Sequence, residues 1–329
     1  MKVLMLTDHT SHTAYDSVYA LPQAMSSYSD DIDVFATSRA ISVNHFLCKT
    51  PVVDYCLVDN GFSFENRESY FDKDSMSQCD LSVFDVIFFR IDRPVTDEYL
   101  NYCREVAPNA KYVNTPEGLI KTSSKEYLNN FRAICPEFVI AHTLDEVLEF
   151  SKDRETVLKP LGGYGGKGLV RISSNDKIYI ESNMLSGEAA KNYLINISKQ
   201  EYPIMAMRYL KRVNEGDKRI LVVAGVCLGA VLRVPKKDSW LCNLAQGATS
   251  VKASLTEKET EIIKHIDSYL EKEGITVYGI DTLVDDNGER ILSEINTTNV
   301  GGFVQLEETS GGGILEKAVE LIFNRLGED

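Results

Sequence analysis

Two carboxylates and an amide near the C-terminal end of the chain are spaced so that a β-hairpin would bring them together. The dipeptide Asn287-Gly288 lies between two apolar runs, which is the strongest short-range signal of a hairpin. A two-residue turn there would place Asp281 opposite Glu294, with Asn296 two residues further on the same face. The same register predicts three further cross-strand pairs: Asp286 with Glu289, Asp285 with Arg290, and Leu283 with Leu292.

Oxygen ligands of this kind suit magnesium or manganese, bound together with the phosphates of a substrate. The alternative is the solvated face of a surface hairpin, on which two facing carboxylates would only repel each other.

A glycine-rich run could bind phosphate through its backbone. The chain contains Gly163-Tyr164-Gly165-Gly166-Lys167-Gly168 between predicted strands at 156–160 and 169–172. A dinucleotide fingerprint would have to open a helix, and a Walker A motif would need glycine in place of Leu161. A glycine-rich turn between strands can instead lay N–H groups over a phosphate chain, with Lys159 adding a positive charge. The alternative is a flexible hairpin tip.

Arg219 begins one predicted strand and Arg233 ends the next. Two arginines on neighbouring strands can clamp a transferring phosphoryl group or a carboxylate. For either arginine taken alone, a surface salt bridge is the default interpretation, and for Lys125 alone it is a solvated helix face. The histidines show no spacing typical of a metal site, and no nucleophile motif is present. The pattern therefore favours metal-assisted chemistry on phosphates.

The composition limits the class of protein. The formal net charge of -14 argues against nucleic acid or an anionic membrane as a partner. The seven cysteines are irregularly spaced without a Cys-x-x-Cys pair, which indicates reduced thiols rather than disulfides or zinc. The first seven residues predict a strand rather than a secretory signal, and no apolar run approaches the roughly 18 residues of a membrane span. We therefore expect a cytoplasmic protein without a nucleic-acid or membrane partner.

Strand–helix alternation in the first third predicts a parallel α/β sheet that ends near Asn114, with residues 41–83 irregular. From residue 124 onward the pattern predicts mixed antiparallel α+β structure. The expected strands are 3–6, 32–36, 86–90, 138–141, 156–160, 169–172, 204–209, 219–224 and 227–234, followed by the hairpin. The expected helices are 16–25, 96–106, 144–150, 189–197, 257–273 and 314–326, with a helical segment from 124.

These groups occur in a fixed order along the chain. After the lysines and the glycine run come Met207-Arg208-Tyr209-Leu210, Glu215-Gly216-Asp217-Lys218-Arg219, Asn243 and Glu294-Ile295-Asn296. This order resembles the ATP-grasp superfamily, and most closely its bacterial (prokaryotic-type) glutathione synthetases. Near the N-terminus, Arg90-Ile91-Asp92-Arg93-Pro94 and Asp16-Ser17-Val18-Tyr19-Ala20 resemble the same family.

The resemblance implies an ATP-grasp fold in three parts. An N-terminal parallel α/β substrate domain would occupy 1–120, a mobile lid with the glycine loop 121–206, and a C-terminal, mixed or antiparallel, β-rich catalytic subdomain 207–329. By matching position, ATP would be bound by Lys125, Lys159, Gly163, Tyr164, Gly165, Gly166, Tyr209, Leu210 and Asp217. Magnesium or manganese would be bound by Asp281, Glu294 and Asn296, and the acyl phosphate would face Arg219 and Arg233.

The implied activity is that of an ATP-dependent carboxylate–amine ligase working through an acyl phosphate. The default substrates are γ-glutamylcysteine and glycine, as in glutathione biosynthesis, and a homo-oligomer is expected. The alternatives are another amino acid or peptide pair and a non-catalytic ATP-binding module. Two departures leave the substrates open. Residues 297–303 are not the family's Ser/Pro/Thr-rich stretch, and Leu241 stands where the family usually has arginine.

Overall fold

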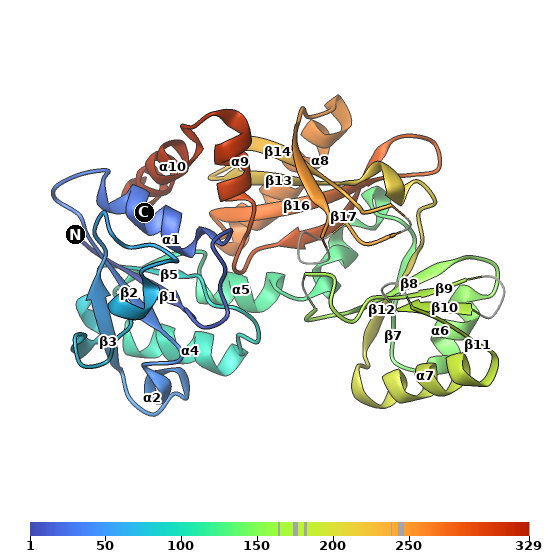
Figure 1. The fold of residues 1–329 in the computed structure, drawn as a ribbon, viewed down its shortest axis with the longest axis horizontal. Helices are drawn as coiled ribbons and strands as arrows, with labels where there is room; N and C mark the ends of the chain where they lie inside the picture. Colours follow the sequence, from blue (N-terminus) through green and yellow to red (C-terminus); the bar gives the residue numbers. More distant parts are fainter. Residues whose placement is uncertain (164, 174–176, 181–182, 238, 243–246, 329) are drawn as a thin grey trace.

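The computed structural model describes residues 1–163, 165–173, 177–180, 183–237, 239–242 and 247–328. Within these residues the chain forms three β-sheets, which Figure 1 shows at the left, at the lower right and, between them, at the top. None of the helices in these described ranges is both long and apolar enough to cross a membrane.

The first sheet has the strand order β4-β3-β2-β1-β5-β6, and its four strands β2, β1, β5 and β6 run parallel. Their bounds are β1 (Lys2–Thr7), β2 (Asp33–Ser38), β5 (Val86–Phe89) and β6 (Lys111–Val113). The main helices of this region are α1 (Ser17–Ser26), α4 (Asp97–Val106) and α5 (Pro116–Thr122).

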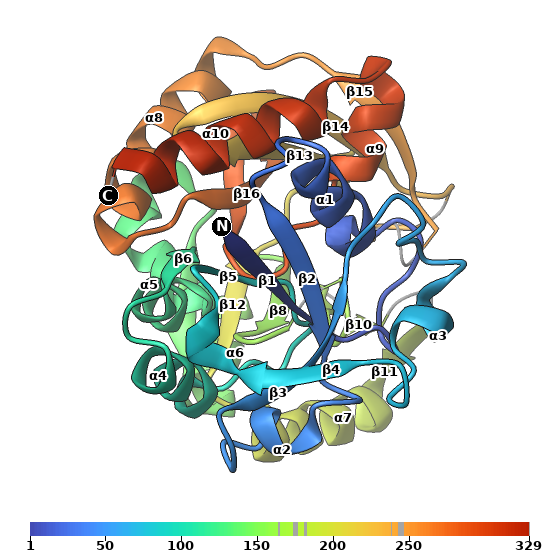
Figure 2. The ribbon, with the colours of Figure 1, turned by 90° about the vertical axis from the view of Figure 1, so that its left-hand side faces the viewer.

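Side chains of β1 alternate between two hydrophobic cores. Val3 and Met5 pack in the core that includes residues of α1 and α10, whereas Leu4 and Leu6 pack in the core that includes residues of α4 and α5. Figure 2 shows α1 and α10 on one side of these strands and α4 and α5 on the other. Helices on both faces are typical of a parallel sheet, so the predicted α/β architecture is confirmed.

The prediction that residues 41–83 are irregular was wrong. This stretch contains α2 (Val43–Phe46), β3 (Val52–Leu57), α3 (Arg67–Tyr70), β4 (Ser77–Asp80) and the short 3-10 helix η1 (Leu81–Val83). Strand β3 joins β2 in the antiparallel direction, and β4 forms the edge of the sheet. Every residue of β4 is at least partly exposed, so the strand lacks the apolar run that marks the buried strands.

The second sheet is antiparallel, with the order β11-β10-β9-β8-β12-β7. Its elements are β7 (Phe138–Ala141), α6 (Leu144–Ser151), β8 (Thr156–Pro160), β9 (Val170–Ile172), β10 (Lys177–Ile180), β11 (Asn183–Ser186), α7 (Gly187–Gln200) and β12 (Ile204–Arg208). This region packs around a hydrophobic cluster of its own. Strand β12 ends two residues beyond the expected domain limit at 206, and the three domain ranges stay predictions.

The third sheet is also antiparallel, with the order β15-β14-β13-β16-β17. Its strands are β13 (Asp217–Val223), β14 (Val226–Val234), β15 (Thr249–Ala253), β16 (Val277–Val284) and β17 (Arg290–Asn296). The remaining elements are η2 (Lys125–Ile134), η3 (Val213–Glu215), α8 (Glu257–Leu270), η5 (Glu271–Glu273), α9 (Phe303–Ser310) and α10 (Ile314–Glu328). Helix α8 begins at a capping box formed by Thr256 and Glu259, and η5 after it stops at Gly274, whose φ is +70°.

Candidate active site

The hairpin of β16 and β17 places Asp281 opposite Glu294, as the sequence predicts. The predicted two-residue turn at Asn287-Gly288, from which that pairing was inferred, was wrong. The loop closes with Val284 paired to Arg290, and Leu283 pairs with Ile291 rather than Leu292. The other two expected pairs, Asp285 with Arg290 and Asp286 with Glu289, are therefore shifted as well.

The Asp285 side chain explains the longer loop. Its Oδ1 accepts hydrogen bonds from the N–H groups of Asn287 and Glu289, each at 2.9 Å, and Gly288 takes a φ of +96°. This is the pattern of a type I turn followed by a left-handed residue. A register shift between Asp281 and Thr282 then restores the predicted pairing at the site.

A cluster of two arginines and two aspartates lies beside this pair. Arg219 on β13 donates to both carboxylate oxygens of Asp281, from Nη2 to Oδ2 at 2.9 Å. Arg233 on β14 donates to both oxygens of Asp217 at 2.7 Å and lies 3.0 Å from Asp281 Oδ2. Asn296 Nδ2 donates to the same Asp281 oxygen at 3.4 Å. The predicted phosphoryl clamp and the predicted metal ligands thus meet at Asp281.

The two carboxylates have opposite pKa shifts. Burial raises the pKa of Asp217 to about 6, with the neighbouring Asp281 adding to the rise and Arg233 opposing it. Burial would also raise the pKa of Asp281, but Arg219 and Arg233 outweigh it and hold that pKa well below its usual range. Two coupled carboxylates lose their protons in separate steps, so this pair carries one negative charge firmly and a second only near neutral pH.

The two predicted lysines are buried and not on solvated surfaces. Lys125, in the first turn of η2, donates to the Gly163 carbonyl oxygen and lies 3.5 Å from Glu294 Oε1. Lys159, on β8, reaches the Ser293 carbonyl and hydroxyl oxygens at 3.4 and 3.3 Å. Burial lowers the pKa of Lys159, and Glu294 opposes that shift. The default interpretation of Lys125 as part of a solvated helix face was wrong.

The glycine loop connects β8 to β9, which pair in the antiparallel direction. No helix follows it, so the dinucleotide fingerprint is excluded. Gly165 and Gly166 have φ values of +63° and +77°, which only glycine adopts without strain. Tyr164, which we expected to contact ATP, and Asn243 lie outside the described residues.

At the other end of the site, Tyr209 is held from two sides. Its N–H donates to the Glu155 carbonyl oxygen at 2.8 Å. The Arg171 guanidinium lies 3.8 Å from the centre of the Tyr209 ring and is itself bound by the Glu155 carboxylate. The indole of Trp240 approaches the same ring edge-on, with centroids 6.4 Å apart. The result is an aromatic wall with a cation on one face.

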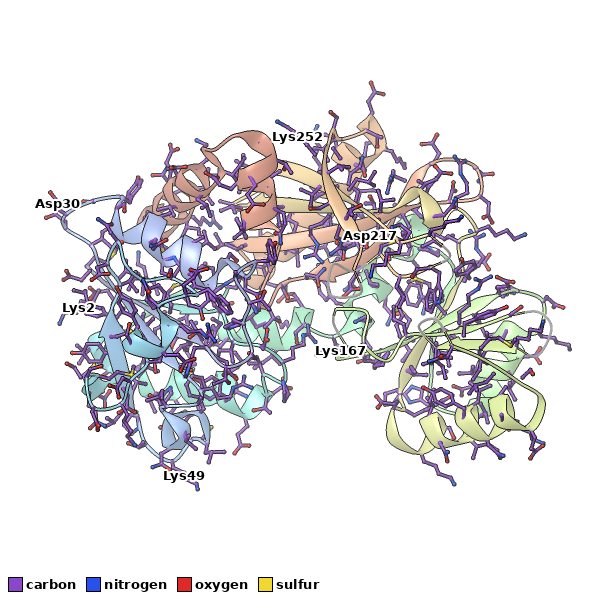
Figure 3. All side chains as sticks on the ribbon, viewed as in Figure 1. Lys2, Asp30, Lys49, Lys167, Asp217 and Lys252 are labelled. Atoms are coloured by element: carbon purple, nitrogen blue, oxygen red, sulfur yellow. The ribbon has the colours of Figure 1, made fainter. Side chains whose placement is uncertain are left out.

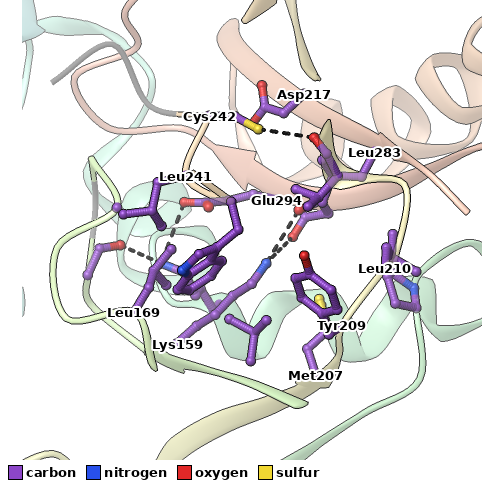
Figure 4. Close-up of a pocket in the computed structure, with 18 of the residues that line it drawn as sticks. Lys159, Leu169, Met207, Tyr209, Leu210, Asp217, Leu241, Cys242, Leu283 and Glu294 are labelled. Atoms are coloured by element: carbon purple, nitrogen blue, oxygen red, sulfur yellow. Dashed lines mark hydrogen bonds and ion pairs between the residues drawn. The ribbon is translucent and has the colours of Figure 1, made fainter. Parts of the chain in front are cut away.

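One pocket joins most of these residues. Of the predicted residues, its lining includes Lys125, Lys159, Gly163, Gly166, Tyr209, Leu210, Asp217 and Glu294. Figure 4 shows Lys159 reaching from β8 toward the strand that carries Glu294, with Tyr209 beside it. Figure 3 labels Asp217 on β13 and one further lining residue, Lys167 on the glycine loop. Arg219, Arg233, Asp281 and Asn296 do not line this pocket but connect to it through Asp217 and Glu294.

Three functional candidates had no role in the sequence interpretation. Trp240, Cys242 and Ser293 all line the pocket. Trp240 is the one tryptophan of the sequence, which was a signal that could have been followed. Leu241, noted as a departure from the family, lines the same pocket. The segment 240–242 therefore contributes a largely apolar surface to the pocket.

The donor set fits a magnesium ion in its chemistry, because two carboxylates and an amide supply only oxygen ligands. Two features limit that fit. Within the described ranges no three His, Cys, Asp or Glu side chains are grouped closely enough to hold a metal. In addition, Asp281 already accepts hydrogen bonds from two guanidinium groups. A metal here would need further oxygen ligands from a substrate's phosphates.

This chain is similar to known ligases in both sequence and fold. A family model described as the ATP-grasp domain of prokaryotic glutathione synthetase matches residues 124–311. The glutathione synthetase of Parasynechococcus marenigrum (strain WH8102) is 33% identical over 246 residues, covering 73% of this chain and 75% of that protein. That of Gloeobacter violaceus (strain ATCC 29082 / PCC 7421) is 28% identical over 335 residues, covering 97% and 96%. The crystal structure of D-cycloserine synthetase DcsG shares the fold, with a TM-score of 0.65 and 14% identity over 99% of this chain and 100% of that one.

Proposed function

Because the chain belongs to the prokaryotic glutathione synthetase family of ATP-grasp ligases, we propose that it joins γ-glutamylcysteine to glycine using ATP. Family membership makes it an ATP-dependent ligase that forms carbon–nitrogen bonds. The observation that carries the proposal is the convergence of Lys125, Lys159 and Glu294 on one pocket, backed by the arginine–aspartate cluster.

The adenine base would bind against Tyr209 and Trp240, since aromatic and apolar side chains line that end of the pocket. The Tyr209 N–H already donates to Glu155, so Leu210 is the residue of the predicted hinge whose N–H we assign to the base. The phosphates would then extend toward Lys125, Lys159 and the glycine loop.

In the first step, an oxygen of the acid's carboxylate attacks the γ-phosphorus, ADP leaves, and an acyl phosphate forms. In the second, the amine nitrogen attacks the acyl carbon and loses a proton, and phosphate leaves. Arg219 and Arg233 would stabilise the negative charge on the transferred group. Asp281, Glu294 and Asn296 would hold magnesium, which when bound neutralises charge on the phosphates. Magnesium, a homo-oligomer and a cytoplasmic location remain predictions.

A second candidate is the same reaction with a different amino acid or peptide pair. The observation that favours it is the segment 297–303, which departs from the family's Ser/Pro/Thr-rich stretch, together with Leu241 where the family usually has an arginine. A non-catalytic ATP-binding module is disfavoured, because binding alone does not require Arg219 or Arg233.

Phosphate release from ATP tests the proposal. We expect ADP and phosphate only when acid and amine are both present, and a hydroxamate when hydroxylamine replaces the amine, since it traps an acyl phosphate. Tight ATP binding without release for any substrate pair would support the module instead. Release with other pairs but not with γ-glutamylcysteine and glycine would support the second candidate.

A further inference from the structure

A second cavity, of about 310 Å³, lies beside the glycine loop. It is lined by parts of the chain that are far apart in sequence: the segment after β5, helices α4 and α5, the start of the glycine loop and the segment after β17. Its volume is at the lower end of the range of about 300–1,000 Å³ that is typical of small-molecule sites.

This cavity adjoins the phosphate end of the nucleotide pocket. In three segments, a residue that lines the cavity stands within four positions of one that lines the pocket: Ser123 and Lys125, Gly162 and Gly163, Thr298 and Glu294. Neither Tyr209 nor Trp240 at the base end lines the cavity. A group bound in the cavity would therefore lie next to the γ-phosphate, where the acid and the amine must meet.

The walls of the cavity are mainly apolar. Pro94, Val95, Leu100 and Leu119 supply aliphatic surface, and the two leucines are almost fully buried. The Thr298 hydroxyl is also buried, and it forms no hydrogen bond with any residue in the described ranges. Arg93 and Ser123 also line the cavity, and Arg93 donates to two backbone carbonyl oxygens, so the aliphatic part of the lining favours a hydrocarbon group with few polar atoms.

Arg93 fixes the wall between the cavity and the pocket. Its Nη2 donates to the Ser123 carbonyl oxygen at 2.6 Å, and its Nη1 donates to the Gly162 carbonyl oxygen at 3.2 Å. One side chain of the N-terminal region thus ties the start of the glycine loop to the residue before Ser124-Lys125. The cavity is formed by the contact between these regions and would not exist in any one of them alone.

We propose that this cavity receives an aliphatic side chain of one of the two substrates, next to the bond that the enzyme forms. The inference rests on the proposed ligase activity and favours the second candidate given above, in which the same reaction joins a different amino acid or peptide pair. Glycine has no side chain, and the side chain of cysteine is short, so the pair γ-glutamylcysteine and glycine would leave most of the cavity unfilled. An acid or an amine with a valine- or leucine-sized side chain would occupy more of it and bury more apolar surface against Leu100 and Leu119.

Two substrate series separate the acid from the amine. One series varies the C-terminal residue of a γ-glutamyl dipeptide from alanine through cysteine to valine and leucine, with glycine as the amine. The other varies the amine from glycine through alanine to valine and leucine, with γ-glutamylcysteine as the acid. In one series we expect kcat/KM to rise by about tenfold or more per added methylene group until the cavity is full.

Filling the cavity provides the matched variant. Val95 is only partly buried and packs against the edge of the core, so Val95→Leu and Val95→Phe add volume at the cavity wall. We expect the kcat/KM ratio between the largest and the smallest side chain to fall stepwise through the two variants. The control is Val226→Phe, an exposed position at the start of β14, which should leave that ratio unchanged.

The outcomes distinguish this inference from the function on which it rests. If no pair in either series releases phosphate, the ligase function itself fails. If turnover is fastest with the smallest side chain in both series, the aliphatic subsite is overturned while the ligase stands. It is equally overturned if a preference for large side chains persists unchanged in Val95→Phe, with thermal unfolding showing that the variant is folded.

Discussion

Two regions of the site are stabilised in different ways. On β13, β14 and β16, charged side chains form ion pairs with one another. In the glycine loop after β8, backbone carbonyl oxygens accept hydrogen bonds from side chains of other segments. Arg219 and Arg233 grip two buried aspartates at distances of 3.0 Å or less. In the loop, the carbonyl oxygens of Gly162 and Gly163 accept hydrogen bonds from Arg93 and Lys125. Both regions border the same reaction site.

The difference follows from what each region must do. Charges that stabilise a transferred phosphoryl group act best when they are already oriented, and an antiparallel register with buried ion pairs provides that. A loop that covers phosphates must place N–H groups close to the ligand, and left-handed glycines allow this without a side chain in the way. The cluster should therefore respond to loss of charge, and the loop to added side-chain volume.

The largest effect is expected from Arg219→Ala. Asp281 would lose its bidentate partner but keep Arg233, so we expect a loss of about 1.5–3 kcal/mol in the free energy of unfolding, as for a hydrogen bond to a charged group. Turnover should fall by about 10²–10³-fold because a group that stabilises the transferred phosphoryl is removed. Urea denaturation and kcat measure the two effects. In the control Lys258→Ala, a surface pair with Glu261 on α8 is lost, and we expect no more than about 1 kcal/mol and unchanged turnover. If both variants lost the same unfolding free energy and the same turnover, the arginine–aspartate cluster would contribute no more than a surface ion pair.

Glu294→Ala should affect catalysis more than stability. The carboxylate faces Asp281 and is partly exposed, so its removal relieves repulsion and leaves Lys125 bonded to Gly163. We expect magnesium-dependent turnover to fall by about 10²-fold or more, with an unfolding midpoint close to that of the wild type. Glu289→Ala, in the exposed loop of the same hairpin, is the control. Undiminished activity in Glu294→Ala would refute the metal assignment.

The raised pKa of Asp217 predicts a pH-dependent stability. The folded protein holds this proton more tightly than the unfolded chain, so the contribution of Asp217 is fully present below about pH 4 and is lost as the pH rises to about 6. The difference in unfolding free energy between wild type and Asp217→Asn should decline in that window, by at most about 1.4 kcal/mol per pH unit. Denaturation curves at pH 4, 5, 6 and 7 measure it. Parallel curves would show that Asp217 is not the group with the raised pKa.

The smallest effect is expected in the loop, from Gly165→Val. The φ of +63° is unfavourable for a β-branched residue by about 1–2 kcal/mol, so turnover should slow by about tenfold while the rest of the protein stays folded. The control is Gly327→Val near the end of α10, where an added Cβ meets no atom within 4 Å. Wild-type kinetics in Gly165→Val would count against a role for the loop in covering the phosphates.

Local signals predicted most regular elements correctly. Helix α8 with η5 matches the predicted helix at 257–273, because the Thr256 cap and Gly274 are signals contained in a few residues. Strand β4 was missed because it is a polar, exposed edge strand, whereas β3 was missed although Val52–Leu57 is largely apolar. The pairing of Asp281 with Glu294 was correct although the predicted turn was wrong, because the longer loop and the bulge after Asp281 offset each other.

By itself, the sequence determined the residue types, their order, and the local turns and caps, because these depend on neighbours a few positions away. It also identified the family through motifs in a fixed order. The tertiary structure alone decided that Lys125 is buried, that Asp281 joins arginines from two other strands, and that Trp240 meets Tyr209. The tertiary structure alone also decided that Val95 and Thr298 line one cavity. Burial and ion pairing depend on which distant segments pack together, and no local pattern of residues specifies that.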